Sequence, residues 1–278
     1  MTSCAALFVA GALAGLAPGP ARAATNELWE YDITWIGVSV GTMVVQSATA
    51  ADGSLLRSIR IRNRPWIALV YPVDNTVECR VADTPAGPRH TVTKKMGEKD
   101  FTQDDALTLW PATGQAIWTN AVSNAFHAFE VPRGSRDFVS FFFDLRDAAG
   151  PGPWSARGDY QLVMDAGVHG LEIHAGPVET IRTPRGKRAA RPVRVVSKSP
   201  ALFTRNTPRA VWVDAEDPVV IYADVETRFG VVRGTLARWE RDGRPVEWPG
   251  PAPESSRGRA TDPPRAAGWD RPRAPGDW

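Results

Sequence analysis

The sequence is short of cysteine, of long apolar runs and of an excess of either charge. Cys4 and Cys79 are its only cysteines, so a chain without its first 23 residues holds one thiol and no intramolecular disulfide. No later stretch approaches the roughly 18 apolar residues of a membrane-spanning helix. A formal net charge of +2 excludes a polyelectrolyte, while 43% hydrophobic residues exclude a disordered chain.

Motifs of enzymes and metal sites are also missing. The sequence has no G-x-S-x-G elbow, no phosphate-binding glycine loop and no dinucleotide fingerprint, so we assign no catalytic residue and no cofactor. On a strand, Glu172 and His174 share a face while His169 points away, and we therefore predict no metal site there. The chain has so many carboxylates that its sequence neither identifies nor excludes a catalytic pair of the glycosidase kind. A hydrolase or carbohydrate-active enzyme on the same scaffold is therefore the alternative function.

The first 23 residues have the organisation of a secretory signal peptide. Fourteen uncharged residues, 4–17, precede a Pro-Gly-Pro break and Ala21-Arg22-Ala23, a small-x-small cleavage site. We therefore expect export and a periplasmic location after cleavage near Ala23. No Lys or Arg precedes the apolar run, so a mis-assigned start codon and an uncleaved anchor stay open as alternatives.

From residue 28 onward the dominant hydrophobic period is two, the period of a half-buried strand. Trp29, Tyr31, Ile33 and Trp35 alternate with polar residues and fall on one face. Gly37 then supplies a tight turn into a second strand, which predicts an antiparallel meander.

Similar short runs, separated by turn residues, continue to about residue 240. They fall at 28–35, 38–47, 55–63, 73–81, 89–96, 100–110, 115–120, 125–131, 160–166, 169–175, 178–183, 190–197, 209–213, 218–226 and 230–239. The proline-bounded stretch 64–72 predicts a short helical or irregular crossing. Without long helices between strands, this spacing predicts a mainly β fold: a curved antiparallel sheet, as an incomplete barrel or sandwich, with one or two short helices. We expect a single domain over residues 24–248.

Residues 137–146 follow the helical period instead. Apolar residues recur at i, i+3, i+4 and i+7 from Phe138 to Leu145, with Asp137 placed as the N-cap and Arg146 near the C-terminal end. We expect this helix to pack on the sheet.

Two further segments bear on partners. Residues 249–278 are rich in Pro, Gly and Arg and predict a disordered tail, in which Trp269 and Trp278 are either anchors for a partner or incidental aromatics. A scaffold function through this tail is a third hypothesis. Cys79 lies in a strand-like segment and is predicted to be a small buried hydrophobe without a chemical role.

Residues 182–194 contain six cations and no acid. Such a potential attracts phosphates of lipid head groups or of anionic envelope polymers, and we take Arg185, Lys187 and Arg188 as candidates for binding an anionic surface. A solvated hairpin around the Pro-Arg-Gly turn at 184–186 explains the same pattern. Export argues against nucleic acid as the partner.

Four segments of the chain resemble the bacterial family known as domain of unknown function 3108. They are YDITWIGVSVGTM (31–43), VPRGSRDFVSFFFDLR (131–146), VETIRTPRGKRAARPVRVV (178–196) and VWVDAEDPVVIYADVETRFGVVRGTL (211–236). Matching positions are Asp32, Trp35, Gly37 and Gly41 in the opening strand pair, with Asp137, Ser140 and Arg146 in the helix. The resemblance implies a mainly antiparallel β fold outside the cytoplasm and implies no reaction.

These observations favour a non-catalytic binding or structural module of the bacterial envelope. A curved sheet that closes incompletely leaves an aromatic groove on its inner face, suited to an acyl chain, a hydrophobic peptide or a partner protein. The residues expected to line it are Trp29, Tyr31, Trp35, Phe101 and Trp212. The same side chains suit an ordinary core. Partners are therefore expected among lipids, anionic envelope polymers and envelope proteins.

Overall fold

The computed structural model describes residues 26–148, 157–199, 202, 206–227 and 230–247. The predicted signal peptide (1–23) and the predicted tail (249–278) lie outside these residues. Within the described residues, none of the helices has the length and apolar character needed to span a bilayer.

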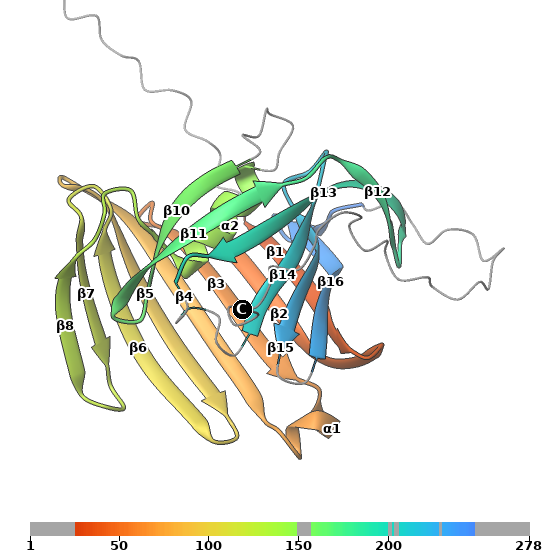
Figure 1. Ribbon diagram of the computed structural model, residues 1–278, viewed down its shortest axis with the longest axis horizontal. Coiled ribbons are helices and arrows are strands. Elements are labelled where there is room, and N and C mark those ends of the chain that lie inside the picture. The colour runs from red at the N-terminus through yellow and green to blue at the C-terminus, as the bar shows by residue number, and fades with distance from the viewer. Residues whose placement is uncertain (1–25, 149–156, 200–201, 203–205, 228–229, 248–278) are drawn as a thin grey trace, which may run out of the picture.

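Seventeen strands and two helices make up the described part of the chain (Figure 1). The strands are β1 (Glu27–Trp35), β2 (Val38–Thr49), β3 (Leu55–Asn63), β4 (Val73–Thr84), β5 (Gly87–Glu98), β6 (Phe101–Trp110), β7 (Gln115–Asn120), β8 (Ala125–Glu130), β9 (Arg136–Asp137), β10 (Arg157–Met164), β11 (Gly167–Ala175), β12 (Glu179–Thr183), β13 (Gly186–Ser197), β14 (Asn206–Asp214), β15 (Val220–Thr227), β16 (Gly230–Arg241) and β17 (Arg244–Pro245). The helices are α1 (Pro65–Ala68), which occupies the predicted crossing, and α2 (Phe138–Ala148).

All of these strands belong to one sheet. Sequential hairpins run from β1 to β8, and β1 also pairs with β16, which continues through β15, β14, β13 and β11 to β10. β12 pairs with β13 and β17 with β16, and the short contact of β9 with β10 is the one parallel pairing among the described strands. The prediction of a mainly antiparallel β fold is confirmed.

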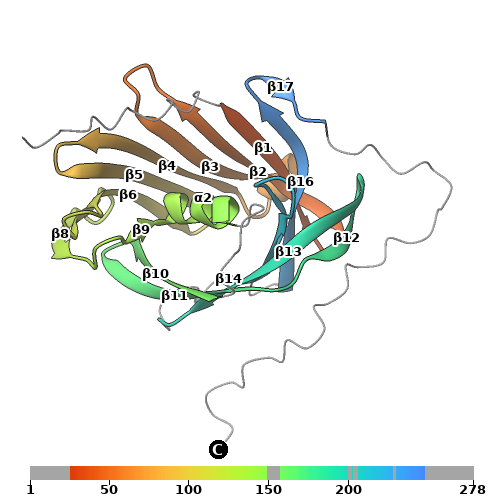
Figure 2. The same ribbon diagram turned by 90° about the horizontal axis from the view of Figure 1, so that it is seen from above.

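The sheet curves around α2, which lies in its interior (Figure 2). Alternation along β1 places Trp29 and Tyr31 on the inner face, where both are buried, and leaves the intervening acids partly exposed. Gly41 of β2 is required by close packing, because a Cβ there would come within 2.6 Å of the Arg62 carbonyl oxygen. One large core cluster joins this wall of the sheet to α2 and to the inner faces of β10, β11 and β13.

The helix buries a wider face than the predicted stripe. Val139 and Phe143, which lie off that stripe, are completely buried, whereas Phe138, which begins it, is 37% exposed. The ring of Phe143 packs edge-on against Trp29, with centroids 5.8 Å apart, and the guanidinium of Arg57 lies 4.2 Å from its centroid. A helix enclosed by a curved sheet has neighbours on several sides. Side chains on several of its faces are therefore buried, and not only those of one apolar stripe.

Candidate functional site

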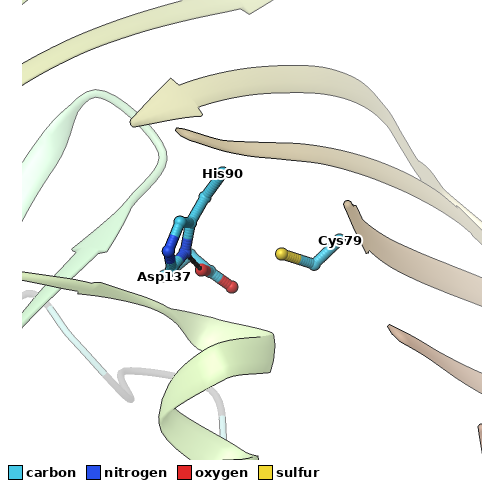
Figure 3. Close-up of side chains that lie close together, drawn as sticks. All are labelled: Cys79, His90 and Asp137. Atoms are coloured by element: carbon cyan, nitrogen blue, oxygen red, sulfur yellow. Dashed lines mark hydrogen bonds and ion pairs between the residues drawn. The ribbon is translucent and has the colours of Figure 1, made fainter. Parts of the chain in front are cut away.

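Three side chains that carry chemistry meet inside the sheet, next to the N-terminus of α2 (Figure 3). They are Cys79 of β4, His90 of β5 and Asp137 of β9, with exposed fractions of 1%, 7% and 0%. Cys79 pairs with Val92, two residues along β5 from His90, so both side chains project from the same face of neighbouring strands. Asp137 immediately precedes α2 in the chain, and its carboxylate contacts the imidazole of His90.

Hydrogen bonds hold the three groups and Ser140 together. Nδ1 of His90 lies 2.6 Å from Oδ2 of Asp137 and 3.2 Å from Oγ of Ser140. The backbone N–H of Ser140 donates to Oδ1 of Asp137 over 2.9 Å, which confirms Asp137 as the N-cap of α2. Sγ of Cys79 lies 3.9 Å from Oγ of Ser140.

Burial and neighbouring charge set the protonation states of the thiol and the carboxyl. Burial, assisted by the negative charge of Asp137, raises the pKa of the Cys79 thiol far above its usual range. Burial also acts to raise the pKa of Asp137, but the hydrogen bonds from His90 and Ser140 and the charge of His90 outweigh it and lower this pKa. The cluster therefore contains a neutral thiol and an ionised carboxylate.

This arrangement does not favour nucleophilic catalysis. A catalytic cysteine needs a lowered thiol pKa and access for substrate, whereas the Cys79 thiol is protonated and almost completely buried. The burial of Cys79 and the cap at Asp137 were predicted from the sequence, whereas their association with His90 was not. His90 and Asp137 are 47 residues apart in the chain, and no local spacing signals such a contact.

The aromatic residues predicted to line a groove lie in different surroundings. Trp29 and Tyr31 are buried in the main core, where Trp29 contacts Phe143 of α2. Trp35 and Phe101 are half-buried at the strand ends where β1 stops and β6 starts. Ligand binding at Trp29 and Tyr31 stays a prediction.

Trp212 belongs to a second, smaller core cluster on the other side of the sheet. The buried members of this cluster are Ile181, Ala190, Trp212, Ile221 and Tyr222. Nε1 of Trp212 donates to Oε1 of Glu179 over 2.8 Å. The five predicted aromatic residues are therefore not brought together on one surface.

The three predicted anion-binding cations also differ in their surroundings. Arg185 and Lys187 are exposed on the β12–β13 hairpin. Arg188 instead turns inward, and its Nε lies 2.6 Å from Oδ2 of the completely buried Asp214, with a further contact of 3.3 Å to Asp217. Arg188 therefore stabilises the β14–β15 turn, and a test of anion binding is cleaner with Arg185 and Lys187 alone.

His169, Glu172 and His174 lie on β11 as the parity argument predicts. Nε2 of His174 is 3.3 Å from Oε1 of Glu172, while His169 has the opposite parity on the strand. In the described part of the chain, the group of three potential metal ligands that come together is the cluster at Cys79, not this one.

One end of the sheet carries an unusual concentration of exposed apolar side chains. They lie on the β1–β2 turn, at the first residue of β2 and on the loop that contains α1, and we call them the apolar rim: Ile36, Val38, Trp66, Leu69 and Val70. The two segments are tied together, because the backbone N–H of Arg64 donates to the Val40 carbonyl and its guanidinium pairs with Asp32 at 3.0 Å. The helix α1 of this rim lies at one end of the sheet (Figure 1).

The backbone of the β1–β2 turn makes the rim more unusual still. Ile36 has φ +51° and Gly37 φ +76°, the conformation of a two-residue type I′ turn. A β-branched residue at positive φ costs of the order of 1–3 kcal/mol, and Asn is the favoured residue at this position. Ile36 is strained and also 78% exposed, so neither folding nor solubility accounts for isoleucine here.

The geometry defines the class of protein as an open, barrel-like antiparallel β-sheet wrapped around one helix. The crystal structure of a β-barrel-like protein of domain of unknown function DUF1849 from Brucella abortus has a similar fold, with a TM-score of 0.52 and 10% identity over 78% of this chain and 97% of that chain. No curated protein matches the sequence. The family described as "Protein of unknown function (DUF3108)" matches residues 30–237, and the chain belongs to this family.

Proposed function

We propose that this protein is an exported, non-catalytic module of the bacterial envelope that binds a membrane surface through its apolar rim. The observation that carries the proposal is the cluster of exposed apolar side chains on two joined loops, with Leu69 88% and Val70 71% exposed. Exposed apolar surface of this kind is costly in water and is typical of an interaction site. The N-terminus, which resembles a signal peptide, supports a location in the bacterial envelope, next to its membranes.

The shape of the rim favours a lipid interface over a protein partner. Its residues protrude from a hairpin tip and a short helix, and such apolar projections insert between lipid head groups. Trp66 is a residue type enriched at membrane interfaces. Near the rim, Arg64 pairs with Asp32, and on β3 both Arg60 and Arg62 pair with Asp74, so these five side chains carry one excess positive charge, which suits the phosphates of lipid head groups.

Ile36→Asn tests the proposal with two effects of opposite sign. The hairpin should become more stable by about 1 kcal/mol, because Asn-Gly relieves the strain of a type I′ turn. Binding to vesicles of zwitterionic lipid should weaken, because an exposed apolar side chain is lost. Flotation with vesicles and urea-induced unfolding measure the two effects on the same preparation.

Matched variants separate the rim from apolar exposure in general. Leu69→Ser/Val70→Ser should weaken flotation strongly, whereas Leu56→Ser/Val178→Ser, which removes two exposed apolar side chains elsewhere, should leave it unchanged. Equal flotation of both double variants and the parent protein would contradict the proposal. Vesicles containing anionic lipid then measure the separate contribution of the β12–β13 hairpin, through Arg185→Ser/Lys187→Ser.

A further inference from the structure

We propose that Cys79, His90 and Asp137 form a binding site for one divalent transition-metal ion, with zinc the best match to their donor atoms. The thiol sulfur, the imidazole Nδ1 and a carboxylate oxygen all lie within 4.8 Å of one another. They come from β4, β5 and β9, and they converge on the inner face, where Val92 and Leu109 are buried apolar neighbours and Arg57 of β3 lies opposite Cys79. This inference is independent of the proposed function.

The donor set selects the kind of ion. Sulfur and imidazole nitrogen are preferred by zinc and its transition-metal neighbours, whereas calcium and magnesium prefer oxygen ligands only. A thiolate, a carboxylate and a neutral imidazole around a divalent cation sum to zero charge. A neutral complex is the form of these groups that burial penalises least.

The distances require little rearrangement. Ligands of a tetrahedral zinc ion lie about 3.3 Å apart or slightly more when the metal–ligand bonds are about 2.0–2.3 Å. Nδ1 of His90 and Oδ2 of Asp137, now 2.6 Å apart, therefore need to separate by less than about 1 Å. Oγ of Ser140, 3.2 Å from Nδ1, lies where a fourth ligand or a hydrogen-bond partner of that ligand belongs.

The role of Asp137 as a helix cap does not account for the cluster. The cap uses Oδ1, which accepts the Ser140 N–H, and leaves Oδ2 directed at His90. A cap needs neither an imidazole nor a thiol beside it. One carboxylate oxygen therefore secures α2 while the other remains available as a ligand.

Cobalt(II) is the probe for the test, because a thiolate bound to cobalt gives a charge-transfer absorption. In a Cys4→Ser background, Cys79 is the only thiol, so this absorption reports Cys79 alone. Because the ligands are buried, cobalt is added while the protein refolds from urea. We expect one cobalt per chain, the charge-transfer band, the visible bands of tetrahedral cobalt, and stoichiometric displacement by zinc.

Variants assign the ligands. Cys79→Ser should abolish the charge-transfer band, and His90→Gln should weaken cobalt binding by more than the roughly 10- to 100-fold typical of an outer-shell partner. Asp137→Asn keeps a good N-cap while removing the carboxylate, so it should weaken binding without loss of α2. The matched control is His174→Gln. His174 lies beside a carboxylate but not beside a thiol, so this variant should bind cobalt like the parent.

The parent protein tests the proposed metal site by itself, even if a variant fails to fold. A refolded parent with its native circular dichroism spectrum and no charge-transfer band at stoichiometric cobalt would overturn the proposal. Unaltered cobalt affinity in a folded His90→Gln protein would overturn it as well.

Discussion

The pKa of Tyr31 is set mainly by its burial inside the sheet. Tyr31 is completely enclosed in the core, and burial raises the pKa of its phenol far above 10, with Arg146 acting weakly in the opposite direction. Arg146 also contacts Glu27 at 2.8 Å, and both side chains are largely buried. The alternation in β1 identified Tyr31 as inward-facing, but its pKa depends on how completely the other walls close over it.

Tyr31 makes stability depend on alkaline pH. Its folded pKa exceeds the unfolded value of 10.0, so the stabilisation is fully present below about pH 10 and is lost as pH rises above it. One pH unit above that value, the loss reaches about 1.4 kcal/mol. Tyr31→Phe removes this loss, so wild type should lose more free energy of unfolding than the variant between about pH 9 and pH 11 in urea titrations. Parallel pH profiles of the two proteins would show that Tyr31 ionises equally in both states.

Among the elements, α2 links the two walls of the curved sheet. Its existence and its N-cap were predicted from residues 137–146, and the hydrogen bond from Ser140 to Asp137 confirms the cap. Its deepest residues were not predicted, because most of the segment is apolar and a hydrophobic stripe does not reveal enclosure from several sides. The strands were predicted more closely, since each carries its own period of two and its own turn residues.

Two phenylalanines of α2 provide a matched comparison of burial. Phe143→Ala should lower the free energy of unfolding by about 3–5 kcal/mol, because it empties a completely buried position against Trp29. Phe138→Ala, in the same helix but partly exposed, should cost less than about 1 kcal/mol. Urea-induced unfolding monitored by circular dichroism measures both. Similar losses for the two variants would show that α2 does not fill the interior as described.

For the whole molecule, the pairing of β1 with β16 joins the N-terminal and C-terminal parts into one sheet. This contact links residues about 200 positions apart, as in the pairing of Tyr31 with Leu236. Each half alone would leave an open strand edge and an incompletely covered core. We therefore expect the sheet to unfold as a unit.

Two truncations test this unit. A chain ending at residue 229 lacks β16 and β17, exposes β1 and loses Leu236 and Trp239 from the core, so we expect it to lose its cooperative unfolding transition. A chain ending at residue 248 lacks only the predicted tail and should keep the free energy of unfolding within about 0.5 kcal/mol. Near-ultraviolet circular dichroism and urea titration distinguish them. A cooperative transition in the shorter chain would show that β16 is dispensable.

The sequence by itself determined the strands, the turns, the helix cap and the family, because alternation, turn chemistry and capping act between residues a few positions apart. Tertiary structure alone decided which inward-facing residues meet. It separated Trp212 from Trp29, turned Arg188 toward Asp214, and joined His90 to Cys79 and Asp137. The physical reason is that these contacts depend on the curvature of the sheet and the position of α2 within it, which arise from the packing of the whole chain and not from any local period.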